Sequence, residues 1–146
     1  MRLWHYDLLE YLPDAQFKGQ LRELMAIMHD WRDKGKTNHL LINKVMEYPK
    51  VDLVKYFIHY EAVYSLRYGK WLSRQYAEFK EFANIQPNVH TNGCFDGWHN
   101  KEYLRVCMTN LYEKHIFGIG KSRISDDDWE KLCKGYKTIT GEDYVI

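Results

Sequence analysis

The sequence predicts an all-α protein, folded as a compact single-domain bundle of three to four helices with long loops. Apolar residues recur at three- and four-residue spacing over long stretches, which is the pattern of amphipathic helices. Glycine, proline and capping residues gather between those stretches, where helices begin and end. With 146 residues and 45% hydrophobic content, the chain can bury about two-thirds of its unfolded surface. We therefore expect residues 1–146 to form one helical domain.

The first helix is predicted from Asp14 to about Asp33. Pro13 precedes it, Asp14 is an N-cap or first-turn acid, and Gly35 stops it. One face is apolar and is expected in the core: Phe17, Leu21, Leu24, Met28 and Trp31. At 100° per residue, Glu23 falls about 120° from that face. Its carboxylate therefore projects from a flank of the helix.

The face that carries Glu23 is lined by small residues. Gly19 lies one turn before it and Ala26 almost one turn after it, with Gln16 a further turn back. These residues leave a notch around the carboxylate that a substrate or another backbone segment can approach closely. Helix packing through the small residues and a catalytic role for Glu23 both remain open on this pattern alone.

A connecting region follows from Gly35 to about Lys50, and a long second helix is predicted over residues 51–83. Its apolar stripe is expected in the core: Leu53, Phe57, Tyr60, Tyr64, Tyr68, Trp71, Phe79 and Phe82. Gly69 is expected to bend or break the helix near its middle. We interpret these aromatic residues as core first and as base-stacking groups only second.

Residues 84–100 are predicted to form a loop that contains His90, Cys94 and His99. Three potential ligands at uneven loop spacing are a weak zinc pattern, so we expect no metal and no other cofactor. A third helix is predicted from Lys101 to about His115. A short fourth helix follows, capped by Ser125, with Trp129 and Leu132 as its buried anchors.

Composition narrows the location and the function classes. The three cysteines lack CxxC spacing, which suits a reducing compartment better than a secreted disulfide framework. Neither a signal peptide nor an apolar run of about 18 residues is evident, so we expect a soluble, cytoplasmic protein. Glycines do not fall at the spacing of a Rossmann fingerprint or a P-loop, and neither a nucleophile elbow nor an HExxH helix is present.

The net charge of +1 argues weakly against a nucleic-acid protein, but the charge is unevenly distributed. Residues 31–80 contain ten lysines and arginines against five acids, a local excess of +5. This excess fits an ordinary solvated surface and a nucleic-acid face about equally well.

Several short motifs carry a family resemblance. Arg2 follows the first residue, Leu12 and Asp14 form a Leu-x-Asp pattern, and Arg-Glu-Leu occupies residues 22–24. A weaker match covers Gly35-Lys36 and the stretch 56–68. Over roughly its first half, the chain resembles the pyrimidine-dimer DNA glycosylases, base-excision enzymes of the endonuclease V type with an all-helical fold.

The resemblance implies a mechanism. Enzymes of this family attack the deoxyribose C1′ with their N-terminal amine, expel the base, leave an imine and then cut the strand by β-elimination. The matching nucleophile is the amine of Met1, whose ordinary pKa of about 7.7 to 8.0 leaves part of it neutral near pH 7. Glu23 would stabilise the cationic sugar and then move protons.

The resemblance also implies the partner, damaged double-stranded DNA with pyrimidine dimers or abasic sites. Arg2, Gln16, Arg22 and Lys36 are the expected DNA-binding residues. The protein is expected to act as a monomer, without a membrane or a small-molecule cofactor. Two alternatives remain open: a non-catalytic nucleic-acid-binding module of the same fold, and a helical protein-interaction domain.

Overall fold

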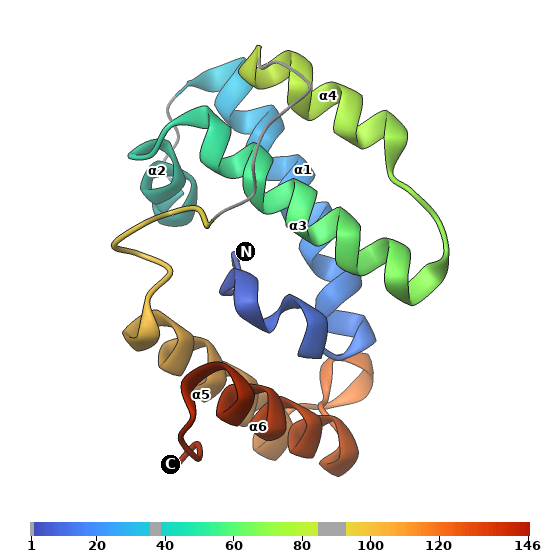
Figure 1. The fold of residues 1–146 in the computed structure, drawn as a ribbon, viewed down its shortest axis with the longest axis vertical. Coiled ribbons are helices and arrows are strands. Elements are labelled where there is room, and N and C mark those ends of the chain that lie inside the picture. Colours follow the sequence, from blue (N-terminus) through green and yellow to red (C-terminus); the bar gives the residue numbers. More distant parts are fainter. Residues whose placement is uncertain (1, 36–38, 85–92) are drawn as a thin grey trace. The chain divides into compact units, whose positions relative to one another are not determined.

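The computed structural model describes residues 2–35, 39–84 and 93–146, and these residues form helices and loops without a strand. The all-α prediction is confirmed, but the expected three to four helices are too few. The described residues contain six α-helices and two short 3-10 helices, which are labelled in part in Figure 1: η1 (Tyr6–Tyr11), α1 (Asp14–Lys34), α2 (Leu40–Met46), α3 (Lys50–Tyr68), α4 (Ser73–Ala83), α5 (Lys101–Phe117), η2 (Gly120–Ser122) and α6 (Asp126–Thr140).

The helices divide between two compact units. The first comprises Met1–Leu3 and Leu21–Asp96, and the second comprises Trp4–Gln20 and Gly97–Ile146. Helix α1 contributes residues 14–20 to the second unit and residues 21–34 to the first. The single-domain organisation of residues 1–146 stays a prediction.

The first unit is built on α3. Helix α4 packs against it (Figure 1). The rings of Phe57 and Phe79 stack with centroids 4.4 Å apart. The core side chains of this unit are fully or almost fully buried: Leu24, Ile27, Met28, Ile42, Val45, Leu53, Val54, Tyr56, Phe57, Tyr60 and Phe79. Most of the predicted apolar stripes on α1 and α3 are therefore confirmed as core.

The predicted long helix over residues 51–83 is two helices. Helix α3 ends at Tyr68, and its C-cap Gly69 adopts φ 67° and donates its N–H to Ser65 O at 2.8 Å; α4 begins four residues after Gly69, at Ser73. This left-handed conformation is one that glycine adopts without steric cost. Because the helical register stops at Gly69, Trp71 does not continue the apolar stripe. Its expected place in the core is wrong, since 67% of its surface is exposed.

The connecting region predicted after Gly35 also contains an element that the sequence reading missed. Helix α2 has only seven residues and places Ile42 and Val45 in the core. Two apolar contacts on so short a segment give little helical periodicity, whereas tertiary packing stabilises a short helix that is marginal alone.

The second unit packs α6 against η1 and α5. Its core is formed by Leu8, Leu9, Leu12, Phe17, Leu104, Cys107, Met108, Leu111, Ile124 and Leu132. Helix α6 has 15 residues, longer than expected, and begins at the predicted cap, where Ser125 Oγ accepts from Asp128 N at 3.1 Å. Of its two predicted anchors, Leu132 is buried whereas Trp129 is only half-buried. Across the described segments, no helix combines the length and apolar character needed to cross a membrane.

Candidate active site

The centre of the candidate site is a hydrogen bond in the first unit. The backbone N–H of Arg2 donates to Glu23 Oε2 at 2.9 Å, and the bond is partly buried. The Glu23 carboxylate thus lies directly against the backbone at the start of the chain. Glu23, which was expected to be catalytic, is therefore in contact with Arg2, which was expected to bind DNA.

Helix α1 sets the position of the carboxylate. Leu24 and Ile27 are fully buried in the first unit, so the helix turns this face toward the core. Glu23 lies off that face and is half-buried, as the helical spacing predicted, and Ala26 is also half-buried. A carboxylate at such a position is held by its helix and keeps access to solvent.

The start of the chain is anchored at two further residues. Leu3, in the first unit, is fully buried. In the second unit, Trp4 donates its backbone N–H to Gln20 Oε1 at 2.8 Å, and Gln20 is fully buried. Sequence reasoning did not single out Gln20, although its spacing of three residues from Glu23 places the two side chains on neighbouring helix positions.

The turn of α1 before Glu23 is fixed by Tyr60 of α3. The Tyr60 ring is fully buried, and its hydroxyl is hydrogen-bonded to the backbone of Leu21. Burial raises the pKa of Tyr60, and the nearby Tyr68 and Tyr64 raise it further. The hydroxyl therefore stays neutral over the whole physiological range and acts as a hydrogen-bonding anchor.

The other predicted site residues are placed differently. Arg22 is exposed on α1, next to Glu23 in sequence. Met1 and Lys36 lie outside the described residues. Gln16 belongs to the second unit and is only 8% exposed, and its Nε2 donates to Ser122 O at 3.0 Å. Its Oε1 has no hydrogen-bond partner in the part of the chain that the structure describes.

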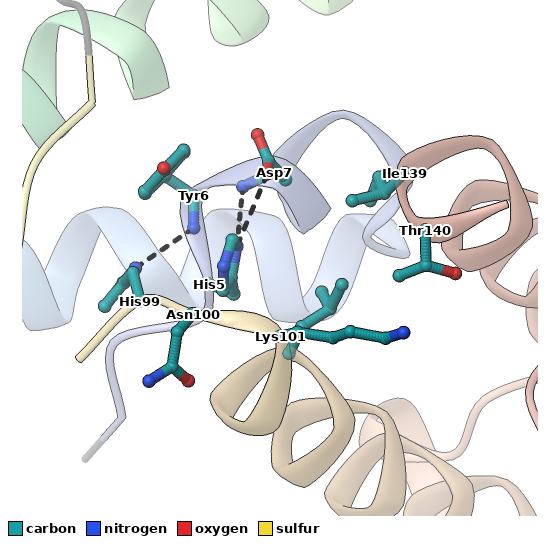
Figure 2. A pocket seen from close by; sticks show the side chains of 9 residues that line it. His5, Tyr6, Asp7, His99, Asn100, Lys101, Ile139 and Thr140 are labelled. Atoms are coloured by element: carbon teal, nitrogen blue, oxygen red, sulfur yellow. Dashed lines mark hydrogen bonds and ion pairs between the residues drawn. The ribbon is translucent and has the colours of Figure 1, made fainter. Parts of the chain in front are cut away.

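The second unit contains an open pocket of about 330 Å³ (Figure 2). Nine side chains line it: His5, Tyr6, Asp7, His99, Asn100, Lys101, Leu104, Ile139 and Thr140. Tyr6 N donates to His99 Nδ1 at 3.3 Å, and Asp7 N donates to His5 Nδ1 at 3.1 Å, as the dashed lines in Figure 2 show. Both imidazoles thus accept hydrogen bonds from the backbone of η1, which gives them a structural role.

The two imidazoles of this pocket are neutral near pH 7. Burial, helped by the neighbouring His5, lowers the pKa of His99 to about 2. Burial also lowers the pKa of His5, against the opposing effect of Asp7. His99 was one of three residues weighed as metal ligands; His90 lies outside the described residues. Among those described, no group of three histidine, cysteine or acidic side chains has the geometry of a metal site.

The contact between Arg2 and Glu23 has a definite chemical capacity. A carboxylate beside the start of the chain can stabilise positive charge that develops nearby and can accept or return a proton within hydrogen-bond reach. An amine at the same place would supply a nucleophile for carbonyl or sugar carbons. The first unit therefore contains the carboxylate of such an amine and carboxylate pair.

Comparison with known proteins identifies the family. The family model for pyrimidine dimer DNA glycosylases matches residues 1–76, a stretch that includes both Arg2 and Glu23 and slightly more than half of the 146 residues. Neither the curated proteins nor the solved structures give a match. On the strength of that match, the chain belongs to the pyrimidine dimer DNA glycosylase family.

Proposed function

We propose that this protein is a DNA repair glycosylase with an associated AP-lyase activity, acting on pyrimidine dimers or abasic sites in double-stranded DNA as a cytoplasmic monomer. The observation that carries the proposal is the hydrogen bond of 2.9 Å between Arg2 N and Glu23 Oε2. It is supported by the family to which the chain belongs.

In the proposed reaction, the neutral N-terminal amine attacks C1′ of the damaged nucleotide, and the bond from C1′ to the base breaks, with the base keeping the electron pair of that bond and taking a proton from solvent. Loss of a proton from nitrogen and opening of the sugar ring leave an imine that joins the protein to the DNA. The proposed nucleophile is the amine of Met1, three covalent bonds before the Arg2 nitrogen that Glu23 binds. At an abasic site the same attack on the C1′ aldehyde expels water instead of a base.

Glu23 is proposed to serve twice. Its carboxylate stabilises the positive charge on the sugar as the base departs. It then takes a proton from the attacking nitrogen and delivers it to O4′, so that the C1′–O4′ bond breaks and the sugar ring opens, and it later assists the removal of a C2′ proton, after which the 3′ phosphate leaves by β-elimination. One carboxylate is sufficient for both steps because it gives the first proton to O4′ and can lose the second to solvent.

Four side chains are proposed to hold the DNA. Arg2 is in contact with Glu23 through its backbone N–H, and the exposed Arg22 directly precedes Glu23 in the sequence. Both guanidinium groups suit contacts with phosphates. Gln16 is 8% exposed and its Nε2 donates to Ser122 O, so a contact with DNA requires this side chain to turn outward, and Lys36 adds a charge in the stretch with a local excess of +5. Extruding the damaged nucleotide costs a few kcal/mol, less where a lesion already stacks poorly, which favours damaged sites.

Borohydride trapping tests the proposal directly. The protein is mixed with a duplex that carries one abasic site, sodium borohydride reduces any imine, and the adduct is mapped by peptide mass. We expect a covalent adduct on the N-terminal peptide at the α-nitrogen of the first residue. The intact mass of the untreated protein identifies that residue, and protein acetylated at the α-amine is the matched control.

Two results would count against the proposal. An adduct on a lysine side chain would show that this lysine, and not the α-amine of the first residue beside Glu23, is the nucleophile. Salt-dependent binding of the abasic duplex without any adduct would instead favour the non-catalytic nucleic-acid-binding module.

A further inference from the structure

The corner between α3 and α4, defined here as residues 66–74, exposes two large apolar side chains. Leu66 is 88% exposed and Trp71 is 67% exposed. A tryptophan is costly to leave in water, because its side chain is among the largest apolar surfaces a protein can bury. Exposure of both side chains within a six-residue stretch makes this corner a candidate contact surface.

The same corner carries positive charge. Residues 62–77 contain Arg67, Lys70 and Arg74 and no aspartate or glutamate. Lys70 and Arg74 are exposed, and neither has an ion pair or hydrogen bond with any residue that the structure describes. In the sequence, Lys70 directly precedes the exposed Trp71 and Arg74 follows it by three residues, so both charges are available to a partner at this corner.

The corner is held in place by buried groups. Glu61 of α3 is only 5% exposed, and its Oε2 accepts the backbone N–H of Leu72 at 2.9 Å. Leu72 is itself 7% exposed, so it anchors the residue directly after Trp71. A fixed backbone reduces the conformational entropy lost when the indole binds a partner.

A short series of contacts joins the corner to the candidate active site within the first unit. Tyr60 precedes Glu61 on α3, and its buried hydroxyl is hydrogen-bonded to the backbone of Leu21. Leu21 lies two residues before Glu23 on α1. The corner and the catalytic carboxylate are thus parts of the same packed unit.

We propose that the α3–α4 corner is a second DNA contact, in which Trp71 stacks on a nucleobase left unpaired at the damaged site and Lys70 and Arg74 bind the adjacent phosphates. The inference rests on the proposed function for the identity of the partner. Charge complementarity favours nucleic acid, because one aromatic ring between cations matches a base between phosphates. A protein-docking patch would instead present a broader apolar area.

Binding measurements on a duplex with a tetrahydrofuran abasic analogue test the proposal without any chemistry, because this analogue cannot form an imine. We expect Trp71→Ala to weaken binding about tenfold, the usual loss for one stacked base, and Trp71→Phe to keep most of the affinity. Leu40, which is 85% exposed on α2, provides the matched control. Leu40→Ala should bind as tightly as the parent protein.

The salt dependence tests the two cations. The double variant Lys70→Gln and Arg74→Gln should reduce the slope of log affinity against log salt by about 1.8, the value for two lost phosphate contacts on a duplex. Lys131→Gln on α6 removes an exposed cation outside the corner and should leave the slope unchanged.

The outcomes separate this inference from the proposed function. Affinity that is the same for Trp71→Ala and the parent protein, with an unchanged salt slope in the double variant, would overturn the corner contact even if the parent protein forms the borohydride adduct. Weakened binding by Trp71→Ala would support the corner even in a protein that forms no adduct. If Trp71→Ala impaired only binding to anionic vesicles or to an acidic protein, the DNA contact would also be wrong.

Discussion

The backbone nitrogen of Arg2 lies 2.9 Å from Glu23 Oε2, so the start of the chain and the middle of α1 meet at one carboxylate. This contact joins two residues that are 21 positions apart. It also allows the role of the charge on Glu23 to be separated from its role in folding, because an amide oxygen can accept the same hydrogen bond.

Glu23→Gln should therefore lower single-turnover strand cleavage at an abasic site by at least about 100-fold, the usual effect of losing a general acid or base. The fold should persist because glutamine still accepts from Arg2 N. Circular dichroism checks the fold, and Glu10→Gln, at an exposed position of η1, is the matched control. Cleavage by Glu23→Gln at the parent rate would show that the carboxylate does no chemistry.

Glu61→Ala should destabilise the protein by about 1 to 3 kcal/mol, the cost of leaving a buried backbone N–H unsatisfied. The group concerned is the N–H of Leu72, which Glu61 binds at 2.9 Å. Glu61→Gln retains an acceptor and should lose less. Urea unfolding measures both variants, and equal stability of Glu61→Ala and the parent protein would contradict a supporting role for this carboxylate.

Gly135→Ala should destabilise α6, although alanine is ordinarily the better helix former. A Cβ at Gly135 would lie 2.6 and 2.7 Å from Cδ2 and Cδ1 of Tyr11, so the ring or the helix must move. We expect a loss of about 1 to 3 kcal/mol in the free energy of unfolding.

The contact with Tyr11 provides its own control. In a double-mutant cycle with Tyr11→Ala, the alanine at position 135 should cost much less, because the ring that it meets is gone. Additive effects of the two substitutions on the free energy of unfolding would show that the loss in Gly135→Ala does not come from the contact with the Tyr11 ring. Thr138→Ala, at an exposed position of the same helix, should change stability by less than about 0.5 kcal/mol.

Stability should fall as the pH decreases from 7 to 5. The pKa of His99 is lowered from 6.5 to about 2 in the folded state. At pH values between these two pKa values, the unfolded chain binds a proton on His99 that the native protein does not. Stability therefore rises with pH over this window, and His99 alone accounts for about 2 kcal/mol between pH 5 and pH 7. Burial of His5 acts in the same direction.

His99→Asn tests this assignment, because the asparagine oxygen can replace Nδ1 as the acceptor for Tyr6 N. The variant should show a smaller loss of stability between pH 7 and pH 5 in denaturant titrations. His39→Asn, at an exposed position, should keep the pH dependence of the parent protein. The same slope in all three proteins would contradict the role given to His99.

Much of the fold could be predicted from the sequence because helix ends and buried helix faces depend on residues that are close together in the chain. The bounds of α1 followed from Pro13 and Gly35, and the buried face with Leu24 and Met28 followed from helical spacing. The spacing also placed Glu23 on a flank of that helix, where the structure has it.

Features that depend on contacts distant in sequence were not predicted. Nothing local indicates that Glu61 would bind Leu72 N, or that Gln20 would bind Trp4 N. Trp71 was wrongly predicted to lie in the core for a related reason. The apolar periodicity of the sequence continues past Gly69, whereas the chain turns at this glycine. The family resemblance implied that the Met1 amine and Glu23 act in one site, but the contact of Arg2 N with Glu23 was not predicted, since no spacing rule brings these residues together.

The exposure of Trp71 also has a spectroscopic consequence. All five tryptophans fall within the described residues, and Trp71 is the one whose side chain is largely open to solvent, whereas Trp4 is 4% exposed. An aqueous quencher such as acrylamide will therefore extinguish the red-edge emission of this indole first. The intrinsic fluorescence of Trp71 can therefore report on the α3–α4 corner without an added label.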